Sequence, residues 1–282
     1  MPKSKALLVT NIYPWLTFYR REGLELEDDL EAFVREVKQS GADSLEPILD
    51  TPKKTNRLAD VLIGQGVAMV SAYVNSTLHE PENLKESIDL VLRLASVAQA
   101  RMGTEIIVTN PSPIRWGGPE NKNDEQIKFQ AESLNTLGEA LSKEGLVLAY
   151  HNHDPELRLA AREFHHMLVA TDPTYVKFCL DSHWIYRGSG NSKVALHDII
   201  KLYGDRITEL HIRQSENGVW TETFGDGDID YTSIVETLTT MGIHPLVTIE
   251  QAVEENSPNT MDSLAAHKIS HRRARETFAR FI

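Results

Sequence analysis

The chain alternates short apolar runs with longer segments in which apolar residues recur every three or four positions. The short runs are typical of buried strands, and the longer repeats are typical of amphipathic helices. Gly41, Gly103 and Gly145 each follow a helical repeat and act as stop signals. The predicted strands lie within residues 6–11, 42–47, 67–72, 105–109, 146–154, 176–180, 207–212 and 246–249. The predicted helices lie within residues 30–37, 58–62, 84–103, 127–141, 163–170, 193–203, 234–241 and 260–282.

This alternation predicts an α/β fold, the (β/α)8 or TIM barrel, as a single domain over residues 1–282. The strands lack a regular polar alternation, as expected for parallel strands that are covered on both faces. A doubly wound open sheet is the alternative. It is disfavoured because the turn after the first strand, Asn11-Ile-Tyr-Pro-Trp15, is not a glycine-rich phosphate loop. The aromatic segment 13–24 is predicted to be a loop, and Asp230 is predicted to cap the helix that follows it.

Four of the predicted strands end in side chains that suit metal binding or acid–base chemistry. These side chains are His151 and His153, Asp181 and His183, His211, and Glu250. In a barrel all strand C-termini open onto one face, so we expect these residues to meet there. Imidazole and carboxylate ligands together favour Mn, Co, Zn or Fe(II) over Ca. His151, His153 or His183 taken singly is equally compatible with a hydrogen-bonded polar group at a strand end, whereas the four strand ends together favour a site.

Composition excludes several classes of function. The net charge of -12 argues against non-specific nucleic-acid binding, which requires a basic surface. Cys179 is the only cysteine, so an intrachain disulfide is impossible and a reducing compartment is expected. The N-terminus lacks the apolar core of a signal peptide. No apolar run approaches the roughly 18–20 residues of a membrane span. We therefore expect a cytoplasmic protein without membrane or nucleic-acid partners.

Five motifs together carry a family resemblance. They are Tyr150-His-Asn-His-Asp154, Leu180-Asp-Ser-His183, Leu210-His-Ile-Arg213, Gly225-Asp-Gly-Asp-Ile-Asp-Tyr231 and Ile249-Glu-Gln251. This pattern resembles the xylose-isomerase-like TIM-barrel superfamily, which includes sugar isomerases, ketose 3-epimerases, inosose dehydratases and endonuclease IV. The resemblance covers nearly the whole chain and is strongest from Leu146 to Gln251.

The resemblance implies a divalent metal cofactor, with manganese favoured among Mn, Co, Zn and Fe. In the epimerase branch the ion is held by Glu, Asp, His and Glu from successive strands. The last three positions fall on Asp181, His211 and Glu250, whereas the first falls on His151. A histidine can bind a metal ion, but a ligating nitrogen cannot also serve as a free base. The metal set implied for this chain is therefore His151, Asp181, His211 and Glu250.

The resemblance also implies proton transfer through a metal-stabilised enediolate, with Glu250 moving the proton on carbon. Its candidate catalytic partners are His183, Glu46 and His153, and the alternative for Glu46 is a capping or solvated carboxylate. Arg213, His153 and Trp116 are candidates for substrate binding. The alternatives are an ion pair for Arg213 and simple packing for Trp116.

The function most strongly implied is that of a metal-dependent isomerase or epimerase acting on a keto-sugar, keto-inositol or related polyol. One alternative is a lyase or dehydratase on a keto-inositol or keto-glycoside, because the same intermediate can expel a β-hydroxyl group. A second is a non-catalytic sugar-binding barrel. An abasic-site endonuclease is disfavoured, because that branch of the superfamily needs an Asp-x-His pair after the seventh strand. No histidine occurs here between His211 and His244. Barrels of this kind often pair, so a homo-oligomer is compatible with the sequence.

Overall fold

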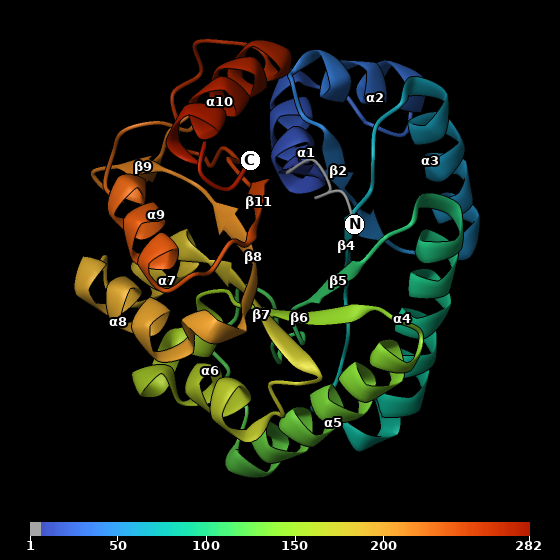
Figure 1. The fold of residues 1–282 in the computed structure, drawn as a ribbon, viewed down its shortest axis with the longest axis vertical. Helices are drawn as coiled ribbons and strands as arrows, with labels where there is room; N and C mark the ends of the chain where they lie inside the picture. Colours follow the sequence, from blue (N-terminus) through green and yellow to red (C-terminus); the bar gives the residue numbers. More distant parts are fainter. Residues whose placement is uncertain (1–6) are drawn as a thin grey trace.

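A computed structural model describes residues 7–282 and confirms the TIM barrel (Figure 1). The main sheet is parallel, with strand order β2-β1-β11-β8-β7-β6-β5-β4-β3. Its strands are β1 Leu8–Asn11, β2 Ser44–Glu46, β3 Ile48–Leu49, β4 Ser71–Val74, β5 Ile106–Thr109, β6 Val147–His151, β7 Val176–Asp181, β8 Ile207–Ile212 and β11 Leu246–Ile249. The third predicted strand lies a few residues too early, since β4 begins at Ser71. Ala6, the first residue of the first predicted strand, lies outside the described residues.

The second strand of the barrel is broken at Pro47 into β2 and β3. Proline has no N–H group for a sheet hydrogen bond, so the ladder is interrupted there. On one side of the break β1 pairs with β2, where Asn11 lies opposite Glu46. On the other side β3 pairs with β4, where Ile48 lies opposite Tyr73. The two fragments together occupy one of the eight strand positions of the barrel.

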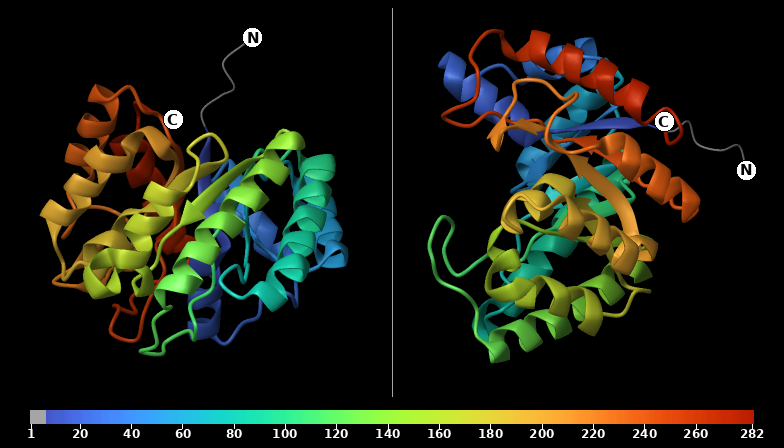
Figure 2. Two further views of the ribbon diagram at one scale, coloured as in Figure 1. Left: turned by 90° about the horizontal axis from the view of Figure 1, so that it is seen from below. Right: turned by 90° about the vertical axis from the view of Figure 1, so that its left-hand side faces the viewer.

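An outer ring of helices covers the sheet, as the views in Figures 1 and 2 show. The helices are α1 Ile12–Glu22, α2 Leu30–Gln39, α3 Pro52–Gln65, α4 Pro81–Met102, α5 Asp124–Lys143, α6 Arg158–Ala170, α7 Ser182–Gly188, α8 Lys193–Tyr203, α9 Tyr231–Thr240 and α10 Ser263–Thr277. Asp230 caps α9, as predicted, by accepting a hydrogen bond from Ser233 N at 3.1 Å. Within the described residues, no helix is long and apolar enough to cross a membrane.

The prediction that segment 13–24 is a loop is wrong, because most of it forms α1. The Asn11 side chain caps the helix by accepting from Tyr13 N, and Gly23 ends it with a left-handed φ of 74°. Phe18 and Tyr19 lie three and four positions after Trp15, and these three aromatic residues are buried together on one face. Trp15 lies within that face and stacks on His267 of α10, with ring centroids 3.7 Å apart. The first and last helices are thereby packed against each other, and Trp15 belongs to the core.

The strand register determines which polar side chains share a level inside the barrel. His151 on β6 lies opposite Cys179 on β7, and Asp181 on β7 lies opposite His211 on β8. Cys179 and Asp181 are two positions apart, so both point to the interior from successive levels. The loop after β8 contains a small hairpin, β9 Ser215–Glu216 and β10 Val219–Trp220, that the sequence did not indicate.

Candidate active site and metal centre

A cavity of about 300 Å³ opens at the C-terminal ends of the barrel strands. Its lining combines aromatic rings with a few polar and charged groups, a composition typical of small-molecule sites. The lining residues are Asn11, Tyr13, Ile48, Tyr73, Asn75, Trp116, His153, Asp154, Trp184, Arg213 and Glu250. Of the predicted site residues, His153, Arg213, Trp116 and Glu250 therefore face one shared space.

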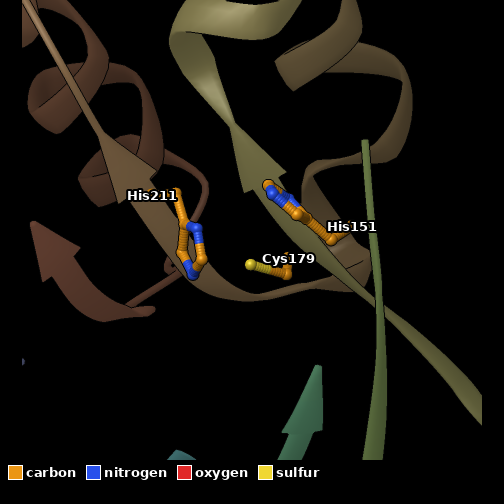
Figure 3. Close-up of side chains that lie close together, drawn as sticks. All are labelled: His151, Cys179 and His211. Atoms are coloured by element: carbon orange, nitrogen blue, oxygen red, sulfur yellow. The ribbon is translucent and has the colours of Figure 1, made fainter. Parts of the chain in front are cut away.

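The four residues predicted to bind metal lie together next to this cavity. His151, Asp181, His211 and Glu250 each offer one ligand atom, and these atoms all lie within 4.8 Å of one another. All four side chains are buried. His151 and His211 come from different strands and approach each other across the barrel interior (Figure 3), with ring centroids 4.7 Å apart. The barrel thus gathers residues that are up to 99 positions apart in the sequence, from His151 to Glu250.

Several atoms of this cluster have no hydrogen-bond partner among residues 7–282. They include both ring nitrogens of His151 and Oδ2 of Asp181. Buried polar atoms normally have partners, and an unpaired one costs about 1–3 kcal/mol. Two imidazoles and two carboxylates are also a normal donor set for a divalent transition metal. By donor chemistry and by unsatisfied atoms, the cluster fits the metal ion that the sequence resemblance implies.

Arg213 controls the charge of Glu250. Its Nη2 lies 2.7 Å from Glu250 Oε2, and its Nε donates to the Glu250 carbonyl oxygen at 2.7 Å. Burial alone would raise the pKa of Glu250, but the Arg213 guanidinium and His211 hold it well below its usual range. Burial raises the pKa of Asp181 to about 8, although Arg213 acts in the opposite direction. In the metal-free protein Glu250 is therefore the ionised member of this carboxyl pair at neutral pH.

Glu46 lies behind His211 and not in the cavity lining. Its Oε1 accepts from Asn11 Nδ2 at 2.6 Å and lies 3.1 Å from His211 Nε2. Glu209 approaches the same nitrogen at 3.6 Å, and burial together with Glu46 raises the pKa of Glu209 to about 7. A carboxylate that accepts one imidazole N–H fixes the ring and leaves the other nitrogen available for a metal ion. In this geometry Glu46 can orient His211, and it does not line the cavity.

His153 lies at the mouth of the cavity between two tryptophans. Its ring centroid is 5.1 Å from that of Trp116 and 5.6 Å from that of Trp184. Its backbone N–H donates to Glu156 Oε2 at 2.7 Å, which anchors the start of the loop. Burial lowers the pKa of His153 to about 4, so the ring is neutral at neutral pH. Its Nδ1 has no partner among the described residues, which leaves a nitrogen free to exchange a proton.

His183 has a different environment from His153. It lies on α7 with Nε2 3.0 Å from Ser215 Oγ, and Ser215 in turn donates to Asp228 Oδ2 at 2.7 Å. Burial lowers the pKa of His183 to about 2. The side chain packs against Tyr186 and Trp220, and it is absent from the cavity lining. The structure therefore places His183 in the wall that supports the site.

Two residues near the cluster were not predicted from the sequence. Glu209 lies two positions before His211 on the same inner face of β8, and Cys179 lies two positions before Asp181 on β7. The period-two rule for strands was sufficient to place both on the inner face. From the sequence, Cys179 gives only an argument against disulfides, and Glu209 is not singled out.

Comparisons with known proteins support the same architecture. A model of a family described as xylose isomerase-like TIM barrel matches residues 34–271. An inosose dehydratase from Bacillus licheniformis is 26% identical over 164 residues, 51% of this chain and 53% of that protein. The chain therefore spans about half the length of that relative. An inosose dehydratase from Clostridium botulinum is 24% identical over 263 residues, 84% of this chain and 86% of that protein.

A solved structure of a 3-keto-D-glucoside 4-epimerase from E. coli is similar in fold, with a TM-score of 0.71. It is 16% identical in sequence, and the match covers 96% of this chain and 100% of that chain. At this level of identity the comparison establishes the shared fold.

Proposed function

This chain belongs to the xylose isomerase-like TIM barrel family, and from that premise we propose that it is a divalent-metal-dependent isomerase or epimerase. Its substrate class is a keto-sugar, a keto-inositol or a related polyol. The observation that carries the proposal is the buried cluster of His151, Asp181, His211 and Glu250, whose ligand atoms lie within 4.8 Å of one another. The cluster adjoins a cavity lined by aromatic rings, which suit the apolar faces of sugar rings.

His151, Asp181, His211 and Glu250 would hold the metal ion. When bound, the ion would polarise a substrate carbonyl as a Lewis acid. Glu46 supports this assignment from behind, because its carboxylate lies 3.1 Å from His211 Nε2 and can keep the opposite nitrogen free.

The groups proposed to move protons are Glu250 and His153, because both line the cavity. Glu250 is ionised at neutral pH and can accept a proton from substrate carbon. His153 is neutral, with a free ring nitrogen that can take or return a second proton. The Arg213 side chain holds Glu250 in place by contacting both the carboxylate and the main-chain carbonyl oxygen of Glu250. Trp116 contributes an aromatic ring to the cavity lining.

A dehydratase is the second candidate, and the inosose dehydratases among the similar proteins favour it. The same residues serve that reaction, because abstraction of the proton next to a carbonyl prepares both isomerisation and loss of a β-hydroxyl group. The third candidate is a non-catalytic sugar-binding barrel, which predicts neither isomerisation nor loss of a β-hydroxyl group.

The deciding experiment incubates the protein, supplied with Mn²⁺, Co²⁺ or Zn²⁺, with candidate ketoses and inososes in D₂O. Deuterium on carbon in an isomeric product supports the isomerase, and loss of water supports the dehydratase. Asp181→Asn is the matched variant, because it removes a proposed ligand without touching the cavity lining. Absence of exchange with every metal, together with unchanged sugar binding in Glu250→Gln, would favour the non-catalytic barrel.

A further inference from the structure

The thiol of Cys179 lies inside the barrel within reach of the same two histidines. Cys179 is buried and free, and it lies opposite His151 in the pairing of β6 with β7. Its Sγ and one nitrogen each of His151 and His211 all lie within 4.8 Å of one another. Figure 3 shows the Cys179 side chain between the two rings. Cys179 lies two positions before Asp181 on β7. The barrel therefore presents a second set of three possible ligands, which shares His151 and His211 with the first set and adds Cys179.

Besides the cysteine, His151 indicates that this deeper set can receive a ligand. Both ring nitrogens of His151 are without hydrogen-bond partners among residues 7–282, and the residue is completely buried. A buried histidine normally makes at least one hydrogen bond. His151 also supplies nitrogen, which is a better partner than a carboxylate oxygen for a thiolate in binding softer ions.

We propose that His151, Cys179 and His211 form a second metal site, specific for thiophilic ions such as Zn²⁺ and Co²⁺. Two imidazoles and one thiolate are three protein ligands for such an ion, and the fourth position remains open to a small molecule. Binding converts the Cys179 thiol to a thiolate and releases its proton to solvent. This site uses Cys179 in place of Asp181 and Glu250.

The two sites share His151 and His211, so we expect an ion in one site to exclude an ion from the other. A thiophilic ion in the deeper site therefore removes two nitrogen ligands from an ion held with Asp181 and Glu250. The consequence is metal discrimination. Mn²⁺ prefers oxygen ligands and binds with Asp181 and Glu250, whereas Zn²⁺ binds with the Cys179 thiolate and displaces Mn²⁺ from the protein. The inference concerns metal binding and does not require the proposed reaction.

The test is optical titration of the metal-free protein with Co²⁺ under anaerobic conditions. A thiolate bound to cobalt gives a charge-transfer band in the near ultraviolet, and Cys179 is the only cysteine that can produce it. We expect the band in the wild-type protein and in Asp181→Asn, and its complete loss in Cys179→Ser. A wild-type Co²⁺ complex without the band, or a band that persists in Cys179→Ser or disappears in Asp181→Asn, overturns the proposal.

A second measurement does not depend on cobalt. Protein loaded with Mn²⁺ is titrated with Zn²⁺, and released Mn²⁺ is followed by its electron paramagnetic resonance signal. We expect at least tenfold more Zn²⁺ to be needed for half-release from Cys179→Ser than from wild type, and equal requirements overturn the proposal. Thermal melting checks that the variant is folded. If the protein binds no Mn²⁺ but shows the cobalt–thiolate band, the proposed catalytic centre fails while this site stands.

Discussion

Arg213 holds Glu250 at two points, through a side-chain ion pair of 2.7 Å and a hydrogen bond of 2.7 Å to the main-chain carbonyl oxygen. The guanidinium also lies 4.1 Å above the ring of Trp220, which shields it from water on that side. The carboxylate is thereby kept both ionised and immobile at the edge of the cavity.

Arg213→Gln should raise the pKa of Glu250, because it removes the cation that stabilises the carboxylate. Glu250 must be ionised to accept a proton, so the acidic limb of the kcat/KM profile should move to higher pH. Stability should fall by about 3–5 kcal/mol, as for other broken buried ion pairs. The matched control is Arg187→Gln, because Arg187 pairs with Glu254 and neither residue lines the cavity. An unshifted acidic limb in Arg213→Gln would contradict this role.

His153→Gln should lower kcat by about 10²–10⁴-fold, the range for loss of a general acid or base. Metal affinity should be unchanged, because His153 is not in the ligand cluster. His183→Gln tests the specificity of this effect, since His183 bonds to Ser215 and does not line the cavity. We expect a much smaller loss of kcat in that variant. Equal losses in both variants would show that His153 has no special part in proton transfer.

Glu46→Gln should weaken metal binding by about 10–100-fold, the usual effect of removing a carboxylate that orients a ligating histidine. Glutamine has nearly the same size, so a loss of affinity reports the loss of the carboxylate charge 3.1 Å from His211 Nε2 and not a cavity. Isothermal titration calorimetry with Mn²⁺ measures the change. If affinity is retained while kcat falls, Glu46 has a direct part in the reaction.

His151→Glu should shift metal preference towards Mn²⁺, because a carboxylate replaces an imidazole in the ligand cluster. The ratio of the Zn²⁺ and Mn²⁺ dissociation constants measures the preference. We expect this ratio to rise at least tenfold relative to wild type. A ratio that does not change would mean that His151 is not a ligand to either ion.

The packing of α10 on α1 should be sensitive to acid. Burial lowers the pKa of His267 to about 3 and of His271 to about 4, whereas both titrate near 6.5 when exposed. Below pH 6.5 the unfolded chain therefore binds protons that the folded protein does not, and stability falls until about pH 3–4. His267→Phe should reduce this loss while keeping an aromatic ring on Trp15. Urea unfolding midpoints of both proteins between pH 7 and pH 4 measure the loss of stability. If the midpoint falls equally with pH in wild type and in His267→Phe, His267 is excluded as a contributor.

The sequence was sufficient to predict the barrel and the polar ends of its strands. Apolar runs and helical repeats depend on local periodicity, which is readable without the fold. The ends of the apolar runs also show that His151, Asp181, His211 and Glu250 lie at strand ends. A TIM barrel brings the C-terminal ends of all its strands to one face. The prediction from local sequence is wrong at α1, where it gives a loop. The N-cap residue Asn11 and the C-cap residue Gly23 are both signals of a helix that the sequence contains.

Tertiary structure alone decided which of these side chains meet. His153 and His183 looked equivalent in the sequence, but the barrel register and the packing of α7 put one in the cavity and the other in its wall. The break at Pro47 and the pairing of β1 with β2 placed Glu46 behind His211. The register of β6 with β7 brought Cys179 beside His151. Periodicity tells which face a side chain occupies, whereas the stagger between strands, set by closure of the whole barrel, determines its neighbours.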